Sequence, residues 1–181
     1  MKNEEFDIIR RILAGNTQEY EWLVRNYQAA VYNVLYQILQ QHEDAEELAQ
    51  YVFVKAYEKL NTFNFQSKFF SWIYRIAINT AVSHQKKAQR FMRLERMPEE
   101  PDHNESNNER RIINEERDAI LKQAIGELKE NYRAVIVLHY FEQLSYAEIA
   151  DVLELPEKKV KSRLFDGRKL LKNLLEKQDF F

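Results

Sequence analysis

Residues Leu144–Leu171, with the sequence LSYAEIADVLELPEKKVKSRLFDGRKLL, decide the fold of the carboxy-terminal part of this chain. Ser145 followed by Glu148 three residues later is a capping box, which predicts the start of a helix. Pro156 disfavours helical geometry at the residue before it and suits the first turn of a helix. The pattern therefore predicts one helix that stops near Glu154 and a second that begins directly after a tight turn. This is the layout of a helix-turn-helix.

The second predicted helix has one apolar side and several cations. Its apolar or small residues recur at i, i+4, i+7 and i+11, namely Val160, Leu164, Gly167 and Leu171. The candidate DNA contacts lie on its other sides: Lys158, Lys159, Lys161, Ser162, Arg163, Phe165 and Lys169. An ordinary helical bundle also produces two amphipathic helices and a solvated basic face. The concentration of cations on the second helix, and the small Ala150 where the two helices approach, favour a helix that enters the major groove.

The composition of the whole chain of 181 residues is typical of an all-α protein. It has only three glycines and three prolines, and almost every apolar run has a helical period. The chain has no cysteine, and its four histidines lack the spacing of a metal site, so we expect no disulfide, metal or cofactor. No segment has the length and apolar character of a signal sequence or a membrane span. We therefore expect a cytoplasmic protein.

The net charge of −2 conceals a strong segregation of charge along the chain. Residues 68–96 hold seven Lys and Arg against one acid, and residues 155–172 hold seven against two. The acids gather instead at residues 43–47 and 99–109. Segregation of this kind suits two separate contacts with nucleic acid on a chain whose other surfaces avoid it or bind a basic partner.

The pattern along the chain predicts two helical domains and a linker. Helices are expected near 4–14, from 17 through 38, near 44–60 and at 68–90, with Gly15 as the carboxy-terminal cap of the first and Thr17 as the amino-terminal cap of the second. Residues 98–109, PEEPDHNESNNE, contain no aliphatic or aromatic side chain and predict a flexible acidic linker. Helices resume near 113–125, 131–142, 145–153 and 157–176. We therefore expect an amino-terminal domain over 1–96, a linker over 97–111 and a helix-turn-helix domain over 112–181.

Three blocks, in this order, resemble the bacterial RNA polymerase sigma factors of the extracytoplasmic-function (ECF) group. EDAEELAQYVFVKAYEKLNTF, Glu43–Phe63, resembles the helix with which that family binds core RNA polymerase. KFFSWIYRIAINTAVSHQKK, Lys68–Lys87, resembles the helix that engages the promoter −10 element. Leu128–Leu171, which begins LKENYRAVIVLHYFEQLSYAEIA, resembles the −35-binding domain. The resemblance covers nearly the whole chain and implies a promoter-specificity subunit with no chemistry of its own.

The resemblance also implies two sets of site residues in the amino-terminal domain. One set would face a coiled coil of the polymerase β′ subunit, with its two apolar members divided between that interface and the core of the chain: Asp44, Glu47, Leu48, Gln50 and Phe53. The other would hold the −10 strand, with a loop lining a base pocket and a helix face following the backbone: Asn64, Phe65, Gln66, Ser67, Lys68, Arg75, Asn79, Thr80, Lys86 and Lys87. A melted strand is read when a base leaves the stack and enters a pocket, while cations and aromatic rings hold the strand. Trp72 has the spacing of a core residue.

Two positions depart from the family pattern. Tyr51 stands where the family commonly has a glutamate, and Asp166 stands where it often has a basic residue. A carboxylate near DNA repels phosphate but accepts a hydrogen bond from a cytosine amino group, so Asp166 is expected to alter the −35 preference or to pair with a lysine. The resemblance further implies the polymerase β flap and an anti-sigma factor as partners, with no membrane insertion of the chain itself.

Two other functions stay open from the residues alone. A stand-alone dimeric regulator would use its amino-terminal helices to dimerise and would bind a palindromic duplex. An enzyme with a helical catalytic domain would need more than the carboxylate pair Asp44 and Glu47, because no histidine or glycine-rich phosphate loop accompanies them. Co-purification with core polymerase distinguishes a sigma factor from both.

Overall fold

The computed structural model describes residues 2–95 and 109–177, and every regular element within these two ranges is helical. The amino-terminal half contains α1 (Lys2–Leu13), α2 (Tyr20–Leu39), α3 (His42–Glu58) and α4 (Phe69–Glu95), with short 3-10 turns at Thr17–Glu19 and Leu60–Thr62. The carboxy-terminal half contains α5 (Glu109–Glu127), α6 (Glu130–Ile136), a π-helical turn (Val137–Phe141), α7 (Tyr146–Leu153) and α8 (Glu157–Lys177). The predicted all-α fold is confirmed. No helix in the described ranges is both long and apolar enough to span a membrane.

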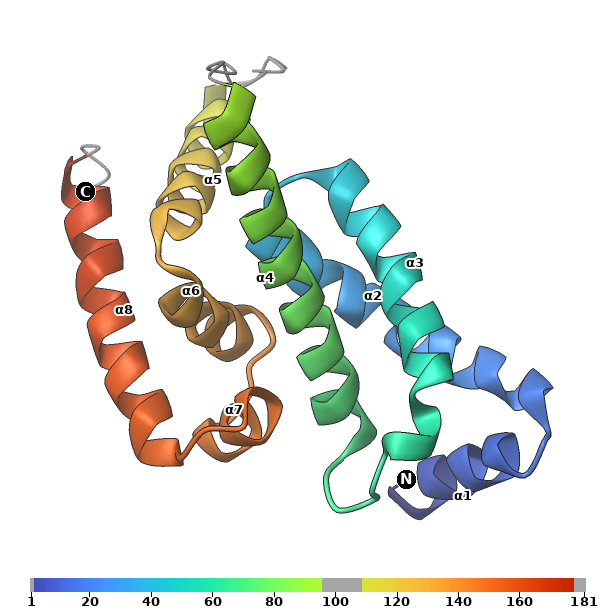
Figure 1. The fold of residues 1–181 in the computed structure, drawn as a ribbon. Coiled ribbons are helices and arrows are strands. Elements are labelled where there is room, and N and C mark those ends of the chain that lie inside the picture. Colours follow the sequence, from blue (N-terminus) through green and yellow to red (C-terminus); the bar gives the residue numbers. More distant parts are fainter. Residues whose placement is uncertain (1, 96–108, 178–181) are drawn as a thin grey trace.

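The helices form two groups that share one continuous core. In the first group α2, α3 and α4 pack against one another, and in the second α8 packs against α6 and α7 (Figure 1). The buried side of α2 follows the helical period, with Leu23, Val31, Val34, Leu35 and Ile38 all inaccessible to solvent or nearly so. Because α7 also lies against α4, the buried residues of the two groups join into one cluster.

The end of α1 agrees with the prediction, but the predicted start of α2 does not. Gly15 has a φ of +109°, and its N–H donates to the Ile12 carbonyl at 3.0 Å while the Asn16 N–H donates to the Arg11 carbonyl at 3.0 Å. These two bonds make a Schellman motif, which confirms Gly15 as the cap. Thr17 is not the cap of α2, because it begins the 3-10 turn that precedes that helix.

The last residues of the predicted linker fall in the first turn of a helix. α5 already begins at Glu109, so residues 109–111 belong to a helix. The rest of the predicted linker, 97–108, lies outside the described residues. The exact domain bounds remain a prediction.

A cluster of aromatic rings holds the segment between α3 and α4 in place. The Phe63 ring is at the centre of this cluster, with its centroid 5.7 Å from that of Phe6, 4.9 Å from Phe65, 5.7 Å from Phe69 and 5.8 Å from Trp72. Aromatic pairs in edge-to-face and tilted arrangements at these separations stabilise a core beyond their simple burial. Trp72 therefore packs in the core, as its spacing predicts.

The conformation of Gly15 can be tested by substitution, with a second glycine, Gly126, as the control. Gly15→Ala puts a side chain on a backbone with positive φ, so it should lower the free energy of unfolding by about 1 kcal/mol. Gly126→Ala, in α5, places a Cβ at an ordinary 4.0 Å from the Gln40 Cγ. That substitution should leave stability unchanged or raise it by about 0.5 kcal/mol, because alanine is the better helix former. Urea unfolding measures both, and an equal loss in the two variants would contradict this account.

Candidate nucleic-acid interface

α7 begins and ends as the sequence predicts. The Ser145 hydroxyl accepts a hydrogen bond from the Glu148 N–H at 3.3 Å, and the Glu148 carboxylate accepts one from the Ser145 N–H at 3.1 Å. Both bonds of the capping box are therefore present. At the other end Glu154 adopts the left-handed conformation, with φ +52°, and its N–H donates to the Ala150 carbonyl. α8 starts directly after Pro156, which completes the helix-turn-helix.

α8 buries one side and presents its cations to solvent. Val160, Leu164 and Gly167 are buried, and a Cβ on Gly167 would lie only 3.3 Å from the Ile136 Cγ1, so this glycine lets α8 pack closely on α6. The exposed predicted residues are Lys158, Lys159, Lys161, Ser162, Phe165 and Lys169. Arg163 is half-buried. The structure thus brings the predicted −35 residues together on the outside of one helix.

The loop predicted to form the base pocket joins the 3-10 turn after α3 to α4. Its members are Asn64, Phe65, Gln66 and Ser67, of which Asn64 and Gln66 are exposed. The Gln66 N–H donates to the Asn64 Oδ1 at 3.1 Å, which closes a local turn. Phe65 has a φ of +58°, and its ring packs edge-on against Phe6 of α1 at 5.5 Å. The ring of Phe65 therefore supports the loop from inside, and the amides on either side of it face solvent.

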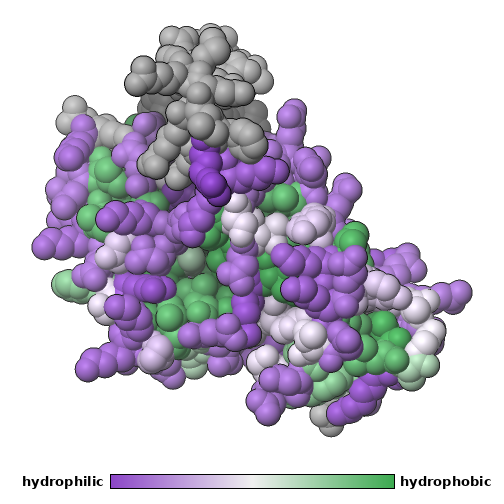
Figure 2. Space-filling model, in the orientation of Figure 1, coloured by the Kyte–Doolittle hydropathy of each residue, from purple (hydrophilic) through white to green (hydrophobic). Residues whose placement is uncertain are grey.

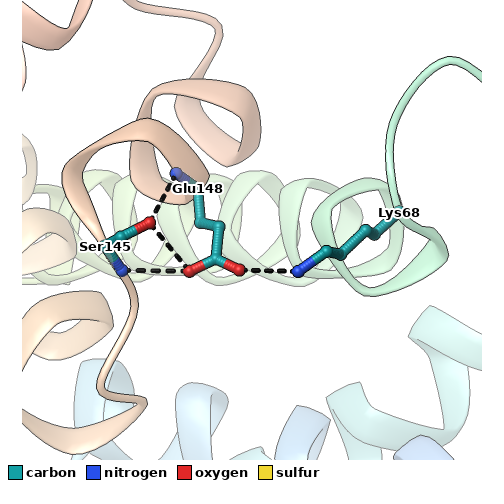
Figure 3. Close-up of polar contacts among 3 residues, drawn as sticks. All are labelled: Lys68, Ser145 and Glu148. Atoms are coloured by element: carbon teal, nitrogen blue, oxygen red, sulfur yellow. Dashed lines mark hydrogen bonds and ion pairs between the residues drawn. The ribbon is translucent and has the colours of Figure 1, made fainter.

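The cationic face of α4 turns toward the carboxy-terminal half. Lys68 Nζ lies 2.8 Å from a Glu148 carboxylate oxygen (Figure 3), and Lys86 Nζ lies 3.2 Å from Glu130. Arg75 Nη1 lies 2.6 Å from Glu154. Three of the predicted −10 cations, Lys68, Arg75 and Lys86, are thus paired with acids of the other half.

The Lys68–Glu148 pair includes the capping carboxylate of α7. The hydrogen bond from Lys68, followed by those from the Ser145 backbone and hydroxyl, holds the pKa of the Glu148 carboxyl down at about 2. The group therefore stays ionised over the whole neutral and mildly acidic range. Its contribution to stability is present above the ordinary glutamate pKa and is lost as the pH falls toward the lowered value.

Thr80, a member of the predicted −10 set, is buried in this structure. Asn79 and Lys87 are exposed, as expected, but the Thr80 side chain is only 6% exposed. Thr80 follows Ile73 and Ala77 at i+7 and i+3, and this spacing puts all three on the buried side of α4. The contact of Thr80 with DNA stays a prediction, and it requires this side chain to become accessible.

The predicted polymerase-binding residues divide between the surface and the core of α3. Glu47 and Gln50 are exposed, while Asp44 and Leu48 are half-buried. Phe53 is 8% exposed and packs in the core, so the part it would take in binding polymerase stays a prediction.

Two apolar side chains on α3 were missed by the sequence analysis as surface features. Val54 is 57% exposed, and Tyr57 is 43% exposed. Together with Tyr51, which is 52% exposed, they repeat at three-residue intervals beside the acids. The three-residue spacing, on the side of α3 opposite its buried residues, is the sequence signal that could have identified these exposed side chains.

Arg133 is an organising residue that sequence reasoning missed. It is buried, and it donates to the Ile125 and Leu128 carbonyls at 3.0 and 2.9 Å and also to the carbonyl of Gly126. A further bond at 3.0 Å reaches the Ile38 carbonyl at the end of α2. Burial lowers the pKa of this guanidinium. Arg133 therefore ties the ends of α5 and α2 together, and no local sequence pattern indicates a buried arginine.

An open apolar groove lies on the carboxy-terminal half. It has a volume of about 430 Å³. Its lining comes from α5, α6, the π-helical turn and α8: Leu121, Ile125, Ile136, Tyr140, Phe141, Arg168, Leu171, Lys172 and Leu175. In Figure 2 hydrophobic residues are visible between α8 and α6, where hydrophilic residues cover most of the surrounding surface. The groove lies nearer the carboxy-terminal end of α8 than the exposed cations Lys158, Lys159 and Lys161.

A basic helix-turn-helix joined to a second helical unit with a cationic helix defines a class of two-part DNA-binding protein, and comparison with known proteins gives its family. The Sigma-70 region 2 family matches residues 23–91, and the Sigma-70 region 4 family matches residues 118–171. RNA polymerase sigma-H factor of Pseudomonas aeruginosa is 30% identical over 184 residues, spanning 97% of this chain and 95% of that protein. ECF RNA polymerase sigma factor SigW of Bacillus subtilis is 30% identical, spanning 92% of this chain and 94% of that protein.

The chain belongs to the sigma-70 family of RNA polymerase sigma factors, in its ECF group. It is a promoter-directing sigma factor, and members of this family are transcription initiation factors and not themselves catalysts. The alternative of a stand-alone dimeric regulator is not favoured.

Two solved structures share the fold. CnrH, solved in complex with the cytosolic domain of CnrY, superposes with a TM-score of 0.69 over 93% of this chain and 95% of that one, at 24% identity. RpoE of Bartonella quintana, solved with the anti-sigma factor NepR, gives a TM-score of 0.67 over 88% of this chain and 98% of that one, at 21% identity.

The role of Arg133 is testable by removing its charge and hydrogen bonds. Arg133→Met leaves several buried carbonyls without a donor, so it should lower the free energy of unfolding by about 3 kcal/mol or more. Arg25→Met is the matched control, because Arg25 makes one exposed pair with Glu21 and should change stability by less than about 0.5 kcal/mol. Equal unfolding midpoints for the two variants in urea would show that Arg133 does not organise the core.

Proposed function

We propose that the chain carries out its promoter-directing role through four surfaces: the exposed side of α3 and the apolar groove between α5 and α8 for core polymerase, the 64–67 loop with α4 for the −10 strand, and the first turns of α8 for the −35 duplex. The observation that carries this proposal is α8, an exposed basic helix in a capped helix-turn-helix, in a chain whose second cationic surface lies on a separate helix. Two separate basic elements suit two separate promoter contacts.

The −35 contact is assigned to the first turns of α8. Lys158, Lys159 and Lys161 are exposed there and supply charge for phosphates, while Ser162 and the exposed ring of Phe165 offer groups to base edges. Asp166 is half-buried and lies one turn after Ser162. Its carboxylate repels phosphate, so it favours sites where a cytosine amino group is within reach.

The −10 contact is assigned to the exposed amides of the loop and to the cations of α4. Asn64 and Gln66 project from a loop that aromatic packing holds in shape, so they are preorganised to meet a base that has left the stack. Lys68, Arg75 and Lys86 supply the charge that follows the phosphate backbone. Strand opening then derives its energy from the capture of unstacked bases, and we assign no catalytic step to the chain.

The contacts with core polymerase are assigned to α3 and to the apolar groove. Glu47 and Gln50, beside the exposed Tyr51 and Val54, combine an acidic rim with apolar contacts, which suits a basic helical partner such as the β′ coiled coil. The groove between α5 and α8 is apolar, and we assign it to the β flap. These partners imply that the chain acts in the cytoplasm. An anti-sigma factor is expected to cover these surfaces, by analogy with the partner of Bartonella quintana RpoE.

Run-off transcription tests the function and the −35 assignment together. Core polymerase with this chain should give discrete new start sites on a pool of promoter fragments, and core alone should not. Lys159→Ala combined with Lys161→Ala should weaken binding of the holoenzyme to promoter duplex about tenfold and flatten its log–log salt dependence by about two. Lys177→Ala removes a cation from the far end of the same helix and should change neither. The absence of both transcripts and core binding would contradict the proposed function. An unchanged salt dependence in the double variant would contradict the −35 assignment.

Charge reversal on α3 tests the core-binding surface. Glu47→Lys should weaken binding to core polymerase about tenfold, because an exposed acid facing a basic partner becomes a like charge. Glu21→Lys is the control, since Glu21 is also exposed but lies on α2. The readout is a competition titration against a labelled sigma factor. Equal affinities for the two variants would rule out this side of α3 as the interface.

A further inference from the structure

The side of α4 assigned to the −10 strand is covered in the free chain by α7. Lys68 directly precedes α4, Ser71 and Arg75 lie on the side of the helix that continues from it, and α7 packs against this helix (Figure 1). Ser71, between the two cations, is only 1% exposed. The helix that would follow the DNA backbone is therefore in contact with the helix-turn-helix domain.

Arg75 caps the carboxy-terminal end of α7. Its Nη2 donates to the Asp151 carbonyl at 2.6 Å, its Nε to the Val152 carbonyl at 3.3 Å, and its Nη1 to the Glu154 carboxylate at 2.6 Å. The last carbonyls of a helix have no partner within it and carry the negative end of the helix dipole. The Arg75 guanidinium thus pairs with terminal carbonyls that have no partner within the short α7. It uses the same N–H donors that a DNA phosphate would engage.

Lys68 holds the opposite end of α7. Its Nζ bonds to Glu148, whose second carboxylate oxygen is already held by the Ser145 N–H and hydroxyl (Figure 3). The capping box fixes this carboxylate in position, so Lys68 meets a preorganised anion. The two cations therefore hold α7 at both of its ends.

The carboxy-terminal half makes further contacts that support the same arrangement. Tyr74 of α4 donates to Glu142 at 2.7 Å, and Lys86 pairs with Glu130. Burial raises the pKa of Glu142. These bonds, with that of Arg133 to the end of α2, make the closed arrangement a built interface with several directional contacts.

This arrangement is incompatible with reading both promoter elements at once. By their names the −10 and −35 elements lie about 25 base pairs apart, which is about 85 Å of duplex. In the structure α7 touches both α4 and α8, so a helix about 10 Å across separates the two assigned DNA-binding elements. The chain has to open before it can occupy a promoter.

We propose that α7 is an intramolecular inhibitor of the −10 surface, in which Glu148, Glu154 and the terminal carbonyls of α7 occupy Lys68 and Arg75 in place of DNA phosphates. The proposal rests on the assignment of α4 to the −10 strand. Promoter DNA and α7 then compete for the same two cations, and the affinity of the free chain for single-stranded DNA is reduced by the fraction of molecules that are closed.

The test removes the two acids and measures opening and DNA binding separately. In the Glu148→Gln, Glu154→Gln variant both ion pairs lose their charge, while glutamine at position 148 still serves the capping box. The control, Glu127→Gln with Glu176→Gln, removes the same charge from exposed sites of the same half that do not contact α4. Since the chain has no cysteine, Arg25→Cys and Asn173→Cys place two dyes on exposed sites of α2 and α8 for energy transfer.

We expect the first variant to lower energy transfer without DNA and to bind a short single-stranded DNA of randomised sequence about threefold tighter or more, with the control unchanged. Unchanged energy transfer would overturn the closed contact. Lower energy transfer with unchanged DNA affinity would overturn its inhibitory role. If neither the parent nor the variant binds the DNA while the dyes separate, the −10 assignment itself fails, and the proposal fails with it.

Discussion

The carbonyl groups at helix ends are the constraint on which the arrangement of this chain depends. The last carbonyls of a helix lack a partner within it, and each one that is buried unpaired costs about 1–3 kcal/mol. Arg75 of the amino-terminal half serves the end of α7, and Arg133 of the carboxy-terminal half serves the end of α2. Each half therefore completes a helix of the other. Because water satisfies the same carbonyls when the halves separate, the net free energy of each such bond is only about 0.5–1.5 kcal/mol, and partners of modest affinity can decide between the two arrangements.

Features with a local cause could be predicted from the sequence. The capping box at Ser145, the break before Pro156 and the Schellman end at Gly15 each depend on residues within one or two turns of one another. The buried sides of α2 and α8 follow from period alone. The family resemblance depended on the order of three such local blocks, which is why it covers nearly the whole chain and agrees with relatives that span it.

The features that could not be predicted are those that depend on the packing of distant segments. Lys68 and Arg75 have the same spacing whether they face solvent, DNA or α7, so their acidic partners are invisible in the sequence. Thr80 is a polar residue on the buried side of α4, and its burial depends on the helices that pack there. Arginine is usually exposed, so the burial of Arg133 can be predicted only once the carbonyls around it are known.

The packing of Phe6 against Phe65 has a practical consequence for anyone who handles this protein. It joins α1 to the loop before α4, so this helix lies beside that loop, while α8 ends at the opposite end of the molecule (Figure 1). A purification tag or fluorescent protein fused ahead of α1 would crowd the loop and disturb the ring that supports it. A fusion placed after α8 would leave unobstructed the loop that we propose captures the −10 strand, and it is therefore the better choice for measuring promoter opening.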